Sequence, residues 1–73
     1  MSPLEFLRDA PFGSKIRYGP HCPVVTVHFI VRNGTMYAHG TEDETNRRVF
    51  LILEGQRLRD ANRGYFDSVE IVE

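Results

Sequence analysis

The segment 24–40, VVTVHFIVRNGTMYAHG, constrains the fold of this chain more than any other. Two runs rich in β-branched and aromatic residues flank Asn33-Gly34, a pair that tolerates the positive φ angles of a type I′ turn. The pattern predicts a β-hairpin and therefore an antiparallel sheet as the scaffold. It leaves no obvious room for catalytic machinery.

A two-residue turn at Asn33-Gly34 also predicts which residues of the hairpin face each other. The expected pairs are Arg32–Thr35, Ile30–Tyr37 and His28–His39 on one face, and Val31–Met36 and Phe29–Ala38 on the other. The second face continues with Val25 and Val27 and is apolar throughout, so we expect it in the core. The first face is mixed, and we expect it to be partly exposed.

The rest of the chain predicts a short helix and further strands. Ser2 can cap a helix that starts at Pro3, with Glu5 three residues after the cap, and Pro11 and Gly13 end it. Segments 14–18 and 68–73 predict short strands. Segment 47–53, RRVFLIL, is apolar at its last five positions and predicts a strand covered on both sides, with a buried helical turn as the alternative.

Two segments stay open. In 41–46, Thr41 and Glu44 match a helix capping box, although Thr45 and Asn46 are poor helix residues. Segment 54–64 is polar, with one helical turn ending at Gly64 as its interpretation. The expected fold class is α+β: a small antiparallel β-sheet of four to five strands around the central hairpin 24–40, with a short N-terminal helix.

Size and cysteine content limit the function classes. A chain of 73 residues forms a single domain, 1–73, and a domain this small cannot easily hold a deep pocket or a cluster of buried charges. We therefore expect no enzyme, no catalytic residue and no cofactor. The single cysteine, Cys22, excludes an internal disulfide and suits a reducing cytoplasm. The first eleven residues include Glu5 and Asp9 and lack a long apolar run, which predicts neither a signal peptide nor a membrane span.

One group of residues resembles metal ligands: His21, Cys22, His28 and His39. Their spacing fits no standard zinc finger or knuckle, and a single thiol weakens a structural site. We expect no metal and interpret the histidines as partly exposed sheet residues, while a metalloprotein or enzyme built on the three histidines remains a third hypothesis. Adjacent residues of an extended segment point to opposite sides, so His21 and Cys22 do not form a base and nucleophile pair.

Basic residues concentrate in one stretch. Five of the nine fall within seventeen positions, at Arg47, Arg48, Arg57, Arg59 and Arg63. Acidic residues flank the stretch on both sides. The net charge of −1 means that the chain lacks the overall positive charge typical of proteins that bind duplex nucleic acid. A solvated face fits this pattern, and so does contact with nucleic acid or an acidic protein surface.

The hairpin offers a second candidate surface. Ile30 and Tyr37 form an apolar spot beside Arg32, and Tyr and Arg are common interface anchors. The candidate partner-binding residues are therefore Ile30, Arg32, Tyr37, Arg57 and Arg59.

The whole chain, from MSPLEFLRDAPFGSKIRYG at 1–19 to GYFDSVEIVE at 64–73, resembles the small RNA-polymerase-binding transcription regulators of lytic Xanthomonas phages. The resemblance rests on length and overall sequence. It implies a non-enzymatic protein of the host bacterial cytoplasm that contacts the β′ N-terminus and the β flap region of host RNA polymerase. Such a protein displaces the σ factor, inhibits initiation, and permits terminator read-through with NusA as a cooperating factor.

We expect a monomer when free and no contact with membranes. The hairpin's exposed face, or an edge beside it, would receive the β′ segment, and the basic stretch 47–63 would face acidic polymerase groups or the emerging RNA. The alternative function is a small nucleic-acid-binding domain that uses this basic stretch.

Overall fold

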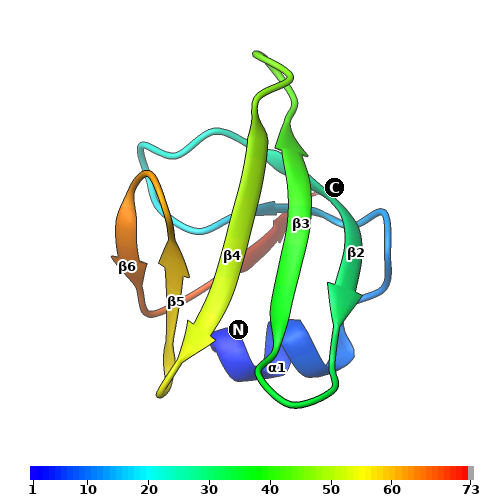
Figure 1. The fold of residues 1–73 in the computed structure, drawn as a ribbon. Helices are drawn as coiled ribbons and strands as arrows, with labels where there is room; N and C mark the ends of the chain where they lie inside the picture. Colours follow the sequence, from blue (N-terminus) through cyan, green and yellow to red (C-terminus); the bar gives the residue numbers. More distant parts are fainter. Residues whose placement is uncertain (73) are drawn as a thin grey trace.

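A computed structural model describes residues 1–72, which form one helix and one seven-stranded sheet. The elements are α1 (Pro3–Asp9), β1 (Lys15–Arg17), β2 (Val25–Val31), β3 (Tyr37–Glu42), β4 (Arg48–Glu54), β5 (Arg57–Asp60), β6 (Gly64–Phe66) and β7 (Glu70–Val72). All neighbouring strands are antiparallel, in the order β6-β5-β4-β3-β2-β1-β7 (Figure 1). The α+β class and the antiparallel sheet are confirmed, but the predicted number of strands is too low. Residue 73, the end of the last predicted strand, lies outside the described residues.

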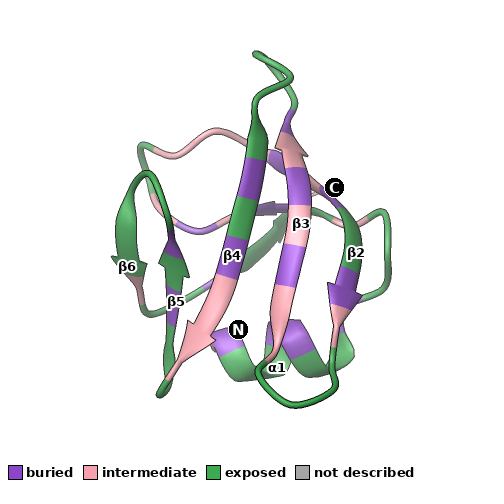
Figure 2. Cartoon of the chain, in the orientation of Figure 1, coloured by how far each residue is buried: buried purple, intermediate pink, exposed green. Residues whose placement is uncertain are grey.

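The sheet curls around a single core. At one end β1 and β7 lie behind β2–β4, at the other end β5 and β6 lie beside β4, and α1 lies across one opening and packs against β4 and β5 (Figure 1). Along β3 and β4 buried positions alternate with more exposed ones, which is the period of two expected for a sheet with one covered face (Figure 2). The core consists of Phe6, Leu7, Ala10, Ile16, Tyr18, Val25, Val27, Ile30, Ala38, Val49, Leu51, Leu58 and Val69.

The helix forms as the sequence predicts. The Ser2 hydroxyl accepts a hydrogen bond from the Glu5 backbone N–H at 3.2 Å, and the Glu5 carboxylate accepts one from the Ser2 N–H at 3.4 Å. Pro3 takes the first turn, where no backbone donor is needed. The helix ends at Asp9, two residues before Pro11, so α1 buries Phe6 and Leu7 in the core and stops. This one helix of residues 1–72 is too short to cross a membrane.

The hairpin exists, but its turn is longer than predicted. Five residues, 32–36, connect β2 to β3, and Val31 pairs with Tyr37. Gly34 has a φ of 76°, whereas Asn33 keeps a negative φ, so the turn is not type I′. A bulge at His28 then absorbs the extra residue, and the predicted register holds below it, where Val27 pairs with Gly40.

The bulge exchanges the faces of the β2 residues beyond it, whereas Tyr37 and Ala38 of β3 keep their predicted faces. Ile30 is 6% exposed and lies in the core, and Phe29 is 45% exposed on the outer face, the reverse of the prediction. A slip of one residue moves each side chain to the other face of a sheet. The pairing of His28 with His39 is wrong for the same reason, because Phe29 faces His39.

The second half of the chain also departs from the prediction. Residues 42–47 form a tight hairpin turn and not a helix: the Asn46 N–H donates to the Glu42 carbonyl at 2.9 Å, and Asn46 has a φ of 59°. The strand predicted at 47–53 is confirmed as β4, but it is not covered on both sides, because Phe50 is 36% exposed. Segment 54–64, interpreted as one helical turn ending at Gly64, instead contains strand β5 at 57–60, and strand β6 begins at Gly64.

Candidate binding surface

Four aromatic rings gather on the outer face of the sheet. They belong to Phe29 of β2, Tyr37 and His39 of β3, and Phe50 of β4, and we call them the aromatic cluster. The imidazole of His39 stacks on Phe29 with 4.7 Å between ring centroids, and meets Phe50 edge to face at 4.9 Å. Tyr37 lies 5.3 Å from Phe50. These are the separations at which aromatic pairs attract each other.

The strand register explains why these rings meet. Phe29, His39 and Phe50 face each other across three adjacent strands, and Tyr37 lies two residues before His39, on the same face. The bulge leaves both His28 and Phe29 exposed. Sequence reasoning missed Phe29 and Phe50, because a two-residue turn places Phe29 in the core and a continuous apolar run suggests that Phe50 is covered.

Arginines flank the cluster. The charged residues that face outward on β2–β6 are Arg48, Arg57, Arg59 and Glu54. Arg59 contacts Glu54 at 3.2 Å, and Arg57 contacts Asp67 at 2.8 Å. Both ion pairs are exposed and therefore weak, so a partner can exchange them. Arg48 forms no ion pair with any described residue.

The structure brings together three of the five predicted contact residues. Tyr37, Arg57 and Arg59 share the outer face. Arg32 lies on the β2–β3 connection, and its guanidinium donates to the carbonyls of Leu7 and Ala10 at 2.7 Å each, at the end of α1. Ile30 is buried, so its predicted exposure is wrong and it is not available as a surface contact.

The basic stretch 47–63 does not form one patch. Arg48, Arg57 and Arg59 face outward, whereas Arg63 contacts the buried carboxylate of Glu42 at 3.3 Å. Arg47 lies in the β3–β4 turn. The fold therefore places three of the five arginines on the outer face and the other two in turns between strands.

Two buried carboxylates are held by hydrogen bonds. Asp60, 2% exposed, accepts from the Tyr18 hydroxyl at 2.5 Å and from the Asn62 N–H at 2.8 Å. Burial, and then the bond to Asp60, raises the pKa of Tyr18 far above its usual range, so the phenol stays protonated. Burial alone would raise the pKa of Glu42, but the bonds from Thr45 and Arg63 outweigh it and lower the pKa.

The structure separates the residues that resemble metal ligands. His28 contacts the Thr41 hydroxyl at 2.6 Å, and His39 belongs to the aromatic cluster. His21 and Cys22 lie on the β1–β2 connection, where burial raises the pKa of the Cys22 thiol. Within residues 1–72, no three histidine, cysteine or carboxylate side chains converge on one point.

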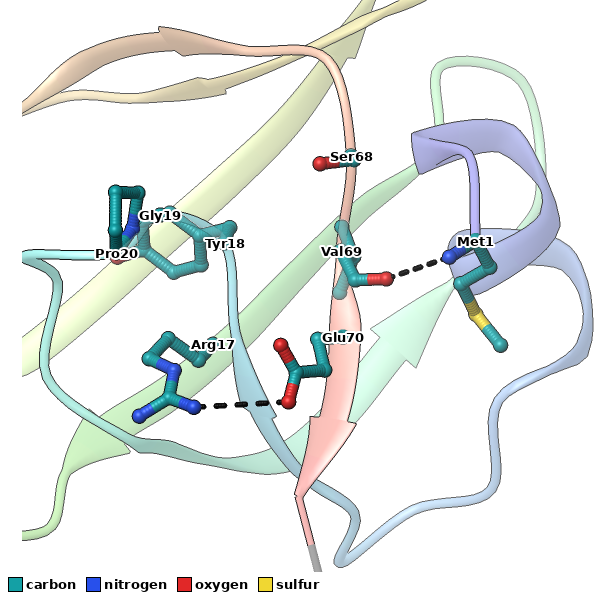
Figure 3. Close-up of a pocket in the computed structure, with 8 residues that line it drawn as sticks. All are labelled: Met1, Arg17, Tyr18, Gly19, Pro20, Ser68, Val69 and Glu70. Carbon is teal, nitrogen blue, oxygen red and sulfur yellow. Dashed lines mark hydrogen bonds and ion pairs between the residues drawn. The ribbon is translucent and has the colours of Figure 1, made fainter.

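The structure has a surface depression of about 580 Å³ beside β1 and β7 (Figure 3). Its polar groups already contact each other: the Met1 ammonium donates to the Val69 carbonyl at 2.7 Å, and Arg17 lies 3.6 Å from Glu70. A ligand there would have to displace these contacts. The outer face of β2–β6 is the stronger candidate.

Compared with protein-family models, curated proteins and solved structures, the chain gives no match.

Proposed function

We propose that this chain is a non-enzymatic transcription regulator that binds the RNA polymerase of a bacterial host. It inhibits initiation by displacing the σ factor and permits terminator read-through. The resemblance over the whole chain supports this function. The structural observation that carries it is the exposed group of Arg57, Arg59 and Tyr65 on the β5–β6 hairpin, at one end of the sheet.

This end of the sheet is a suitable place for an extended polymerase segment. β6 pairs with β5, and no other strand of residues 1–72 pairs with its far side. An extended peptide adds to such an edge by backbone hydrogen bonds. Along the hairpin β2–β3, β4 pairs with β3, and β1 pairs with β2 only at Val25 and Thr26. We place the β′ N-terminus along β6, because Tyr65 and two arginines lie beside that edge.

The side chains beside this edge suit a protein partner. Tyr65 is 49% exposed, and the Arg57 guanidinium lies 5.0 Å from its ring centroid. Tyrosine and arginine are the residue types enriched among interface anchors. Arg57 and Arg59 can exchange Asp67 and Glu54 for acidic groups of the polymerase.

The mechanism needs only a competing surface. A protein that prefers the polymerase state without σ shifts the equilibrium by its differential affinity. A standard half-interface of about 800 Å² is less than a fifth of the 4567 Å² surface of this chain.

The test is gel filtration of the chain with host polymerase holoenzyme. We expect co-elution with loss of σ, and weaker binding of the R57E/R59E variant, with the larger loss at low salt. R8E on α1 reverses one charge at another exposed arginine; it is the matched control for R57E alone and should bind like the wild type. Independent migration of the wild type would overturn the function. Unchanged binding of R57E/R59E would show that the β5–β6 edge is not the polymerase-binding site.

A further inference from the structure

The aromatic cluster is exposed beyond what the fold requires. Phe29 is 45% exposed and Phe50 is 36% exposed, although the core on the other face is complete without them. Tyr37 and His39 lie between them, half-buried. Apolar rings gathered on one open face, rather than scattered singly, are typical of an interaction site.

The rings lie on a sheet surface and not in a groove. The strands of a sheet are about 4.8 Å apart, so Phe29 and Phe50, two strands apart, present separate rings to one ligand. Tyr65 provides a further ring two strands beyond β4. Unpaired bases stack on aromatic side chains spaced over a sheet in this way, and duplex bases do not, because their faces are already stacked.

The charges around the cluster favour a polyanion. Arg48 lies two residues before Phe50 on the same face, and Arg59 lies beyond Ile52, which faces Tyr37. The one outward carboxylate of β2–β6, Glu54, is already held by Arg59. With Asp67, which contacts Arg57, this face has three arginines and two carboxylates and leaves Arg48 without an ion pair to a described residue, although the whole chain has a net charge of −1. A second copy of the chain would bring like charges together, which opposes self-association through this face.

From these contacts we propose that the aromatic cluster binds single-stranded nucleic acid, with bases stacked on Phe29 and Phe50 and phosphates at Arg48 and Arg59. Phe29, Phe50 and Arg48 lie apart from the β5–β6 edge, which shares only Arg59 and Tyr65 with this site, and binding of a strand to them does not depend on polymerase. A regulator bound to polymerase through that edge would still present the cluster to a strand of RNA or DNA.

The first experiment measures fluorescence anisotropy of labelled strands of about twelve nucleotides. Single-stranded RNA, single-stranded DNA and a duplex of the same sequence are compared at about 50 and about 200 mM salt. We expect both single strands to bind more tightly than the duplex, and the preferred single strand identifies the natural source. Equal binding of the duplex, or no binding of either single strand, would overturn the proposal.

The second experiment separates stacking from general hydrophobic contact. F29L and F50L keep apolar side chains but remove the rings, and each should weaken binding by roughly 5- to 150-fold. F50Y should keep it. I71A is the matched control, because Ile71 is 40% exposed on β7, away from the cluster. R48Q should reduce the salt slope by about one. Circular dichroism melting identifies any variant that fails to fold. If one ring variant is unfolded, the binding of the other tests whether the rings stack on bases.

A third measurement keeps the two proposals apart. F29L and F50L should still co-elute with polymerase, and R57E should still bind single strands. If the ring variants lose polymerase and bind single strands normally, the cluster is a protein contact and the nucleic-acid proposal is wrong. If single strands fail to bind while wild-type protein releases σ, only the nucleic-acid site falls.

Discussion

At the scale of single residues, the unexpected feature is a pair of carboxylates inside so small a domain. Asp60 is 2% exposed and Glu42 is 4% exposed. An unpaired charge at such positions would cost several kcal/mol. Each is instead bound by two donors, Asp60 by Tyr18 and Asn62, and Glu42 by Thr45 and Arg63. The domain holds these two buried carboxylates because each has one donor from the adjoining turn, Asn62 or Thr45, and one from a distant segment, Tyr18 or Arg63.

The Tyr18 hydroxyl should therefore matter to stability. Replacing Tyr18 with Phe removes one donor from the buried Asp60 carboxylate and should lower the free energy of unfolding by about 1.5–3 kcal/mol. Urea denaturation at neutral pH measures it. Y37F, which removes a hydroxyl from the outer face, is the control and should change stability by less than about 0.5 kcal/mol. Equal losses in the two variants would contradict the role of Tyr18.

At the scale of elements, Arg32 stabilises the end of helix α1, a role that the sequence around it does not indicate. Helix α1 has seven residues, too few to persist alone in water. Ser2 and Glu5 satisfy its first donors, and the Arg32 guanidinium satisfies two carbonyls at its last turn while placing positive charge at the negative end of the helix. The guanidinium also lies 5.7 Å from the ring centroid of Phe12.

Replacing Arg32 with Met keeps the apolar stem and removes both hydrogen bonds. We expect the free energy of unfolding to fall by about 1–3 kcal/mol, with α1 losing protection in amide hydrogen exchange before the strands do. R57M, at an exposed arginine that contacts no helix carbonyl, is the control. A stability loss without selective exchange in α1 would mean that Arg32 acts elsewhere.

The elements that neighbouring residues specify could be predicted from the sequence, and the features that depend on distant contacts could not. The capping box of α1 and the β-rich runs of the hairpin are local, and both are confirmed. The register is not local, because it depends on the length of the 32–36 connection and on the bulge at His28. Strand β5 was not predicted because it includes Asp60, and an aspartate in a polar segment indicates a loop. Its buried position is explained only by its partner Tyr18, 42 positions away.

At the scale of the whole molecule, the fold separates arginines that lie close together in the sequence. The arginines of 47–63 are divided, and three of them share the outer face with Tyr37. Tyr37, Arg57 and Arg59 could be selected from sequence as exposed polar or amphipathic residues of a predicted surface. Phe29 and Phe50 could not, because an aromatic residue in an apolar run gives no sign of which face it takes until the register is fixed.

The stability of the whole domain should depend on pH through Glu42. Its folded-state pKa is lowered, so ionised Glu42 contributes stability above its unfolded pKa of about 4.3, and that contribution is lost as the pH falls through the lower folded value. Urea denaturation from neutral pH down to about pH 3 should show a decline that is smaller in E42Q, which is also less stable at neutral pH. E44Q changes an exposed carboxylate of the same turn and should follow the wild type. Parallel profiles for wild type and E42Q would show that the pair of Glu42 with Arg63 contributes nothing, and that acid stability is governed by exposed carboxylates such as Asp43, whose pKa Lys15 and Thr26 lower.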